Sequence, residues 1–414
     1  MHNSSRFKLS RCQILAWRIV KNPHNIFMMK IYRKIIWTTL FVGICIVCVS
    51  MYFSNLHVNE MKDLYGVLPK SDFESYLRGM LPQNNFSETE IERDYHFDAE
   101  GADVMVFLHM QKTGGTTLGR HLVRNLDLHK PCVCTKKKKR CDCLTKKNTI
   151  WLFSRYSTGW ACGLHADWTE LKECVEDAMN RKEGFTRKRR YYYISIFRDP
   201  VKRFLSEWKH VRRGATWKTA ELKCNGRSAS LEEVPFCYKD ASWRGVSLDD
   251  FLNCPYNLAR NRQTRMLANL SKINCYNKTG MSEEERNEKM LSSAKENLLD
   301  LSFFGITEFQ KYTQKLFEYT FSLKFINDFV QFNITRSDQT KITEEQKKKI
   351  LDVNRLDIKL YQYAKDLFFQ RVREMKRKTK DYNPIVDHIV ADTFDDSSDY
   401  AFSEDQDQEY EDDY

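Results

Sequence analysis

Glycine and proline are scarce in this chain of 414 residues, with 15 glycines and 8 prolines. This scarcity excludes a fibrous or low-complexity protein. No unit of about 20–50 residues recurs along the chain, which argues against a solenoid or a propeller. Apolar residues, in contrast, make up 42% of the chain and aromatic residues 13%, enough for a sizeable core and for more than one folding unit.

Each end of the chain lacks charges of one sign. The first 34 residues contain eight Lys and Arg residues and no acid, whereas residues 391–414 contain eleven acids and no Lys or Arg. The net charge of +11 therefore hides a net charge of +22 over residues 1–390. We favour an anionic partner as the explanation of this positive charge over an effect on solubility alone. From residue 381 onward we predict an acidic disordered tail, which either only solubilises the chain or folds back as a polyanion mimic.

Charged residues are also absent from Ile35–Phe53, an apolar run of 19 residues. This length is close to the roughly 20 residues that a helix needs to cross a bilayer, and it fits a cleaved signal peptide or a buried core helix less well. The upstream positive charges place the N-terminus in the cytosol. The sequence thus predicts a type II membrane protein with a cytosolic tail (1–34), a transmembrane signal-anchor helix (35–53), a lumenal stem (54–100) and a folded domain (101–380).

Ten of the 13 cysteines lie beyond the apolar run, and this even number predicts disulfide bonds in an oxidising compartment, with the pairing left open. The pairs at 132–134 and 141–143 could also form a zinc site, but in a lumenal protein we favour disulfides. The basic run Lys136–Arg140 between them is either a solvated loop or part of a polyanion-binding surface. Glycosylation motifs compatible with a lumenal location occur at Asn85, Asn269, Asn277 and Asn333.

Strand and helix signals alternate from residue 102 onward. Three short apolar runs of strand type are each followed by a helical pattern. The strand–helix pairs are 103–110 with 118–126, 191–197 with 201–211, and 303–307 with 308–321. This alternation predicts an α/β fold with a mostly parallel sheet flanked by helices.

Helix starts are marked by capping residues. Asp199 and Pro200 suit the cap and first turn of the helix at 201–211. Capping boxes begin further helices at Ser282 and at Thr343. The second of these is predicted to be one long helix packed on the core, rather than a coiled-coil dimer, because one of its sides carries Ile350, Val353, Leu356, Leu360, Tyr363 and Leu367.

The loop Gln111–Thr117, QKTGGTT, lies between a predicted strand and a predicted helix. Gly114 and Gly115 let backbone N–H groups turn inward at the positive end of the helix, which favours anion binding. Lys112 adds a mobile positive charge, and the two threonines add hydroxyl donors. Because the lysine precedes the glycines, the loop differs from the GxxxxGK[ST] loop of nucleoside-triphosphate-binding proteins. A plain tight turn is the alternative interpretation.

A second candidate anion site follows the second predicted strand. Arg198 stands at the end of that strand, and Ser206 lies about two turns into the following helix. An arginine fork and a hydroxyl can hold a phosphate group, and ligands of open α/β sheets gather at such strand ends. A capped helix start without a ligand is the alternative.

These segments resemble the heparan sulfate 6-O-sulfotransferase family over roughly residues 95–375. The resemblance is carried by FLHMQKTGGTTLGRHLVRNL, WLFSRYSTGWACGLHADWTEL, RDPVKRFLSEWKHVRRGATWKT, CPYNLARNRQTRMLANL and FFGITEFQKYTQKLFEYTFSLKFI. It implies a P-loop nucleotide-kinase-like sulfotransferase fold for the domain at 101–380, which would then be catalytic. It also implies 3′-phosphoadenosine 5′-phosphosulfate (PAPS) as co-substrate.

The resemblance assigns residues to the nucleotide in three groups. The group at the 5′-phosphosulfate comprises Gln111, Lys112, Thr113, Gly114, Gly115, Thr116, Thr117, Leu118 and Gly119. Arg198 and Ser206 match the 3′-phosphate site. A segment that closes over the nucleotide comprises Phe329, Val330, Gln331, Thr335 and Arg336.

Transfer of a sulfuryl group to an alcohol requires a base that accepts the hydroxyl proton. The sequence alone does not decide among His109, His165 and His210 for this role. The resemblance implies His165 as the base and Lys112 as the residue that stabilises the leaving group. It further implies contacts to the acceptor sugar from Arg155, Trp160, His165, His210 and Trp217.

The resemblance therefore implies a Golgi type II enzyme that transfers a sulfuryl group from PAPS to the 6-hydroxyl of N-sulfoglucosamine in heparan sulfate. No metal is needed, and the partner is a glycan polyanion rather than a nucleic acid. Three alternatives stay open: a carbohydrate sulfotransferase for another hydroxyl or glycan, a lumenal kinase or nucleotidase, and a non-catalytic heparin-binding membrane protein. The first differs from the main interpretation only in the acceptor contacts.

Overall fold

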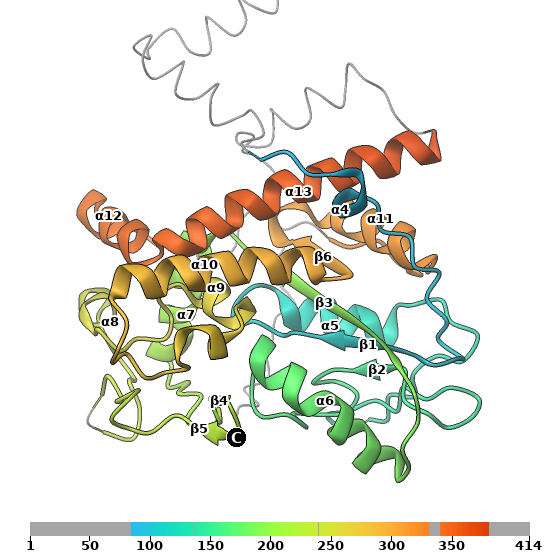
Figure 1. The fold of residues 1–414 in the computed structure, drawn as a ribbon, viewed down its shortest axis with the longest axis horizontal. Coiled ribbons are helices and arrows are strands. Elements are labelled where there is room, and N and C mark those ends of the chain that lie inside the picture. Colours follow the sequence, from blue (N-terminus) through green and yellow to red (C-terminus); the bar gives the residue numbers. More distant parts are fainter. Residues whose placement is uncertain (1–83, 137, 239, 331–339, 381–414) are drawn as a thin grey trace, which may run out of the picture. The chain divides into compact units, whose positions relative to one another are not determined.

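The computed structural model describes residues 84–136, 138–238, 240–330 and 340–380 (Figure 1). All of these described residues belong to one unit. The expected cytosolic tail, transmembrane helix, first part of the stem and acidic tail lie outside the described residues. Within the described ranges, no helix combines the length and the apolar character that crossing a membrane requires.

A four-stranded sheet lies at the centre of this unit. Its strands follow the order β2-β1-β3-β6, and every neighbouring pair is parallel. Their bounds are Asp103–Phe107 (β1), Leu152–Phe153 (β2), Arg190–Phe197 (β3) and Phe303–Ile306 (β6). The prediction of a mostly parallel sheet is confirmed. A separate antiparallel hairpin consists of β4 (Lys223–Cys224) and β5 (Arg227–Ser228).

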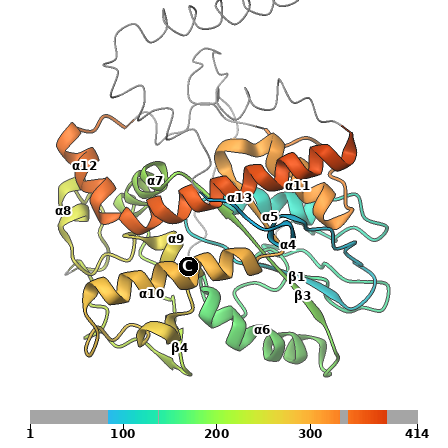
Figure 2. The same cartoon turned by 45° about the horizontal axis from the view of Figure 1, so that its top comes forward.

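Helices flank the sheet. They are α4 (Glu88–Ile91), α5 (Gly115–Arg124), α6 (Trp168–Glu183), α7 (Pro200–Arg212), α8 (Leu248–Asn253), α9 (Arg262–Leu267), α10 (Glu283–Asp300), α11 (Gln310–Phe321), α12 (Glu344–Val353) and α13 (Arg355–Thr379), with 3₁₀ turns η1 (Leu270–Ile273) and η2 (Thr307–Phe309). Helices α11 and α13 pack against β6, and α5 packs against β3. Helix α6 lies well away from α13 in both views (Figures 1 and 2).

The predicted helix starts are confirmed by their hydrogen bonds. The Asp199 side chain accepts from the backbone N–H of Lys202, and Pro200 is the first residue of α7. At α12, Thr343 forms the full reciprocal capping box. At α10, Ser282 Oγ accepts from the N–H of Glu285. Capping residues therefore locate helix starts correctly in this chain.

The single long helix predicted from Thr343 is wrong, because α12 and α13 are separate helices that meet at Asn354. The Asn354 side chain is fully buried; its amide donates to Ile350 O at 2.8 Å, and its oxygen accepts from Asn261 N–H at 3.2 Å. Such side-chain bonds compete with the helical backbone and interrupt the helix. The predicted apolar side does face the core, because Ile350, Leu356, Leu360 and Leu367 are buried.

Residues 84–100, which we assigned to the stem from the sequence, are anchored to the folded unit. The Asn84 side-chain amide donates to Asp366 on α13 at 2.7 Å. The backbone N–H of Tyr95 donates to Thr320 O on α11 at 2.8 Å. The described part of this segment therefore packs on α11 and α13, the two helices that also pack against β6.

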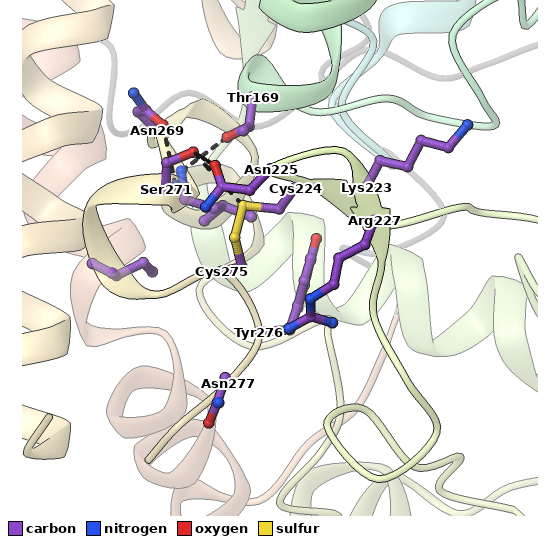
Figure 3. Close-up of a disulfide and its surroundings, with 12 residues drawn as sticks. Thr169, Lys223, Cys224, Asn225, Arg227, Asn269, Ser271, Cys275, Tyr276 and Asn277 are labelled. Atoms are coloured by element: carbon purple, nitrogen blue, oxygen red, sulfur yellow. Dashed lines mark hydrogen bonds between the residues drawn. A yellow bond between two sulfur atoms is a disulfide. The ribbon is translucent and has the colours of Figure 1, made fainter. Parts of the chain in front are cut away.

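The ten cysteines beyond the apolar run form five disulfides, as predicted. The bonds are Cys132–Cys143, Cys134–Cys141, Cys162–Cys174, Cys224–Cys275 and Cys237–Cys254. The first two use all four cysteines of the alternative zinc site, so these thiols are not zinc ligands. Figure 3 shows Cys224–Cys275, which joins the β4–β5 hairpin to the segment after η1. Within η1, the Ser271 hydroxyl also donates to the Asn225 side chain at 2.7 Å.

Candidate functional site

The loops that follow β1, β3 and β6 meet at the carboxyl ends of the strands. The hydroxyl of Thr307, just after β6, lies 2.5 Å from Thr113 O in the loop after β1 and 3.0 Å from Phe197 O at the end of β3. One side chain thus joins three strand ends. Ligands of open parallel sheets bind at this edge.

The Gln111–Thr117 loop has the geometry of an anion cradle. Gly114 has a φ of +84° and is the N-cap of α5, whose first turn contains no acidic residue. A side chain at Gly115 would collide with the His109 ring, so only glycine fits there. The Oε1 atom of Gln111 is buried and accepts no hydrogen bond from the described residues. Backbone N–H groups at a helix N-terminus favour an anion here.

Arg198 reaches this loop from the end of β3. The residue is 8% exposed, and Nη1 donates to Lys112 O at 3.3 Å. Its backbone is fixed by Gln263, whose amide donates to Arg198 O and accepts from Arg198 N–H, both at 2.9 Å. Ser206 lies half-buried on α7. Arg198 therefore joins the two anion sites that were predicted from separate segments, because its side chain contacts the Gln111–Thr117 loop.

His165 lies close to the same strand ends. It has a φ of +52° and is 9% exposed, and its Nδ1 atom is 2.9 Å from His109 O, the carbonyl two residues after β1. A carbonyl only accepts, so Nδ1 carries the proton of this hydrogen bond. In the neutral ring the lone pair is then at Nε2, the atom that can take a proton from a substrate.

His109, the alternative base, is part of the wall of the site. Its ring stacks between Phe107 and Trp160, with centroids 5.4 and 5.8 Å away. Burial, and then the charges of His165, Arg155 and Lys112, hold the pKa of His109 well below its usual range. A neutral, enclosed ring that packs on Gly115 supports the loop and orients His165 through its carbonyl.

Three rings, those of Trp160, Trp217 and His210, line the other side of His165. Trp160 and Trp217 lie 4.6 and 6.3 Å from it, and His210 lies 5.4 Å from Trp217. The guanidinium of Arg155 is 5.5 Å from the Trp160 ring. The predicted acceptor residues, distant in sequence, therefore form one aromatic wall. Aromatic faces with adjacent Arg and His side chains suit the C–H faces and anionic groups of a sulfated sugar.

The Trp217 ring is held by a buried ion cluster. The Arg262 guanidinium lies 5.4 Å from the ring and pairs with Glu207, which also pairs with Arg203. Despite burial, which raises it, the pKa of Glu207 stays below its usual range because of Arg262 and then Arg203. The buried indole N–H of Trp217 has no acceptor among the described residues. It is therefore available to an oxygen atom of a ligand.

The segment that carries His165 is fixed to α6. The disulfide Cys162–Cys174 joins it to the helix, and Asp167 caps the helix in a reciprocal box with Glu170. Glu170 also accepts from Lys223 N–H at 2.8 Å, which attaches the β4–β5 hairpin. Burial, and then the Asp167 charge, raise the pKa of Glu170 to about 8.

The predicted closing segment is described only in part. Phe329 is buried and stacks on His121 of α5 with centroids 4.1 Å apart, and Val330 is exposed. Gln331, Thr335 and Arg336 lie outside the described residues. Phe329 therefore packs on the helix that follows the anion cradle.

Sequence reasoning missed several residues that shape the site. Three contacts span long sequence distances, and no local pattern indicates them: the hydroxyl link of Thr307, the Gln263 clamp on Arg198 and the pairing of Glu207 with Arg262. The Arg203–Glu207 pair, in contrast, has the i,i+4 spacing of an ion pair within one helix. Helix α6 did carry a signal, because Asp167 and Glu170 have the spacing of a capping box.

Comparison with known proteins agrees with this geometry. The model of a sulfotransferase family (Sulfotransfer_2) matches residues 95–364, more than half of the chain. The chain is 55% identical over 301 residues to human heparan-sulfate 6-O-sulfotransferase 3, covering 72% of this chain and 64% of that protein, so it spans less than two thirds of that relative. It is 53% identical to zebrafish heparan-sulfate 6-O-sulfotransferase 3-B (72% and 71% covered) and to chicken heparan-sulfate 6-O-sulfotransferase 2 (72% and 75%). The chain belongs to the heparan-sulfate 6-O-sulfotransferase family.

Proposed function

We propose that the protein transfers a sulfuryl group from PAPS to the 6-hydroxyl of N-sulfoglucosamine in heparan sulfate. The observation that supports this proposal most directly is the position of His165. Its Nδ1 atom is 2.9 Å from the carbonyl of His109, whose own ring packs on Gly115 of the anion cradle, and its ring contacts Trp160 and Trp217 of the aromatic wall. A donor on one side and an acceptor on the other would meet at this ring.

The cradle fits the phosphosulfate end of the donor. Gly114 and Gly115 place backbone N–H groups at the N-terminus of α5. The buried Oε1 atom of Gln111 accepts no hydrogen bond from the described residues. Lys112 supplies a positive charge for the leaving phosphate oxygen. The buried Arg198 guanidinium and the Ser206 hydroxyl would hold the 3′-phosphate.

The chemical step is an in-line displacement. The 6-hydroxyl oxygen forms a bond to sulfur while the bond from sulfur to the phosphate oxygen breaks, and the hydroxyl proton moves to Nε2 of His165. The carbonyl of His109 holds Nδ1–H and so stabilises the imidazolium that forms. The leaving group, 3′-phosphoadenosine 5′-phosphate (PAP), retains the negative charge of the broken bond, and the cradle stabilises this charge.

The direct test is product analysis with the full chain, PAPS and 6-O-desulfated heparin. Disaccharide analysis should find new sulfate at the 6-position of glucosamine. New sulfate at another position would favour the alternative carbohydrate sulfotransferase. No transfer by a folded protein that binds heparin would favour the non-catalytic heparin-binding protein.

We further propose that the protein is a single-pass type II protein of the Golgi membrane, anchored by residues 35–53, with its catalytic domain in the lumen. The apolar run and the upstream positive charges support this orientation, and five disulfides suit an oxidising compartment. Protease treatment of intact Golgi vesicles should leave the domain protected. Digestion without detergent would contradict the orientation.

A further inference from the structure

Two nested disulfides clamp the described residues 132–136 and 138–143 into a short arm, which we call the basic arm. The bonds are Cys132–Cys143 and Cys134–Cys141, and the two sides of the arm exchange backbone hydrogen bonds of 3.0 and 2.9 Å. A chain closed in this way has little conformational freedom left. The side chains at the tip can therefore bind a ligand with a small loss of entropy.

The tip of the basic arm gathers positive charge. Residues 130–150 contain eight Lys and Arg residues and one acidic residue. Lys136, Lys138 and Arg140 are exposed, and no carboxylate of the described residues pairs with them. Partial burial, and then the Arg140 charge, lower the pKa of Lys182 at the end of α6. Crowded like charges repel one another, and an anion that binds among them relieves this repulsion.

The basic arm is attached to the loop that carries the acceptor residues. The N–H of Cys141 donates to Tyr156 O at 2.7 Å, and the Arg140 side chain lies across Gly159, where a Cβ would be 3.1 Å from its Cδ. Tyr156 and Gly159 stand directly beside Arg155 and Trp160 in the sequence. The charges at the tip are therefore held in a fixed position relative to the acceptor wall.

We propose that the basic arm is a second binding segment for the glycan, which contacts sulfate and carboxylate groups of sugars outside the reacting one. This inference rests on the function proposed above for the adjacent site. Each Lys or Arg that meets an anionic group releases counterions from the polyanion, so this part of the affinity depends on salt. The basic arm thereby favours long, already sulfated chains over short or unsulfated ones.

The test compares two triple variants with the same change of charge. Lys136→Gln, Lys138→Gln and Arg140→Gln neutralise the basic arm. Lys347→Gln, Lys348→Gln and Lys349→Gln neutralise an exposed lysine run on α12, which packs on α7 and α8. Calorimetry then measures heparin affinity against salt concentration, and PAP affinity serves as the control for an intact nucleotide side.

The arm variant should lower the slope of log Kd against log salt by about 2, whereas the α12 variant should leave it near the wild-type value. The KM for long heparan sulfate should rise several-fold in the arm variant, and the KM for a tetrasaccharide should stay unchanged. PAP affinity and melting temperature should equal those of the wild type in both variants.

Equal salt slopes in the two variants would overturn the proposal. So would an equal loss of affinity for unsulfated and sulfated chains, because the proposed contact requires dense anionic groups. The proposed function can fail separately. If the wild-type protein transfers no sulfuryl group, but its slope of log Kd for heparin against log salt still depends on the basic arm, the proposed function is refuted and the binding role of the arm is retained.

Discussion

The proposed nucleotide side and the proposed acceptor side of the site, called below the nucleotide side and the acceptor side, are built in different ways. The nucleotide side consists of the Gln111–Thr117 loop and Arg198, which directly follow β1 and β3 and are positioned by the backbone and by helix N-termini. The acceptor side consists of rings from separate loops and from α7, and it depends on side-chain contacts such as that of Arg262 with Trp217.

This difference predicts that the two sides can be disabled independently. A substitution in the aromatic wall leaves the strand ends and the N-terminus of α5 in place, so donor binding should survive it. A substitution at Arg198 leaves the ring contacts in place, so acceptor binding should survive it. Both sides meet at His165, so a substitution of His165 should affect turnover alone.

The largest effect is expected at this meeting point. His165→Ala should reduce kcat roughly 10²–10⁴-fold, because the proposed base is lost, while PAP affinity by calorimetry stays at the wild-type value. His129→Ala, at an exposed histidine, is the matched control and should leave both quantities unchanged. Near-normal turnover in a His165→Ala protein with an unaltered melting temperature would show that another group is the base.

A smaller effect, restricted to the nucleotide side, is expected for Arg198→Ala. Loss of a charge-assisted hydrogen bond costs roughly 1.5–3 kcal/mol, which corresponds to about 10–150-fold in the Kd for PAP. Heparin affinity should change little. Arg227→Ala, at an exposed arginine of β5, serves as the control. An unchanged PAP affinity would return Arg198 to a purely structural role at the start of α7.

On the acceptor side, Trp217→Phe keeps a ring for Arg262 and His210 but removes the indole N–H that has no acceptor among the described residues. The acceptor KM should rise about 2–10-fold, the value of one hydrogen bond, with PAP affinity unchanged. Trp243→Phe, at a half-buried ring 5.2 Å from the ring of Phe251 on α8, is the control. A loss of PAP affinity instead would show that the two sides are coupled.

The smallest effect concerns the support of His165. The raised pKa of Glu170 means that the folded protein holds a proton that the unfolded chain loses near pH 4.3. Stability should therefore fall as the pH rises from about 4 to about 8. Glu170→Gln should melt at a lower temperature than the wild type, because one hydrogen bond is lost, but with a weaker dependence on pH. Glu232→Gln, at an exposed carboxylate, should keep the wild-type dependence; equal slopes in all three proteins would contradict the assignment.

The same contrast explains how much could be predicted from the sequence. The three main strands, their helices and the Gly114–Gly115 cradle follow from local patterns of apolar residues, glycines and caps. The aromatic wall does not, because Trp160 and Trp217 meet only after folding; resemblance to a family was needed to find it. The break at Asn354 also escaped prediction, since one of the two side-chain bonds that cause it joins Asn261, 93 residues away.

The most direct test of the account is a crystal structure with PAP and a 6-O-desulfated heparin oligosaccharide bound together. We expect the 5′-phosphate of PAP to lie in the Gln111–Thr117 loop. We expect the glucosamine 6-hydroxyl to lie about 2.6–3.2 Å from Nε2 of His165, the distance over which a base takes a proton. A 2- or 3-hydroxyl at Nε2, or an oligosaccharide bound away from Trp160 and Trp217, would contradict it.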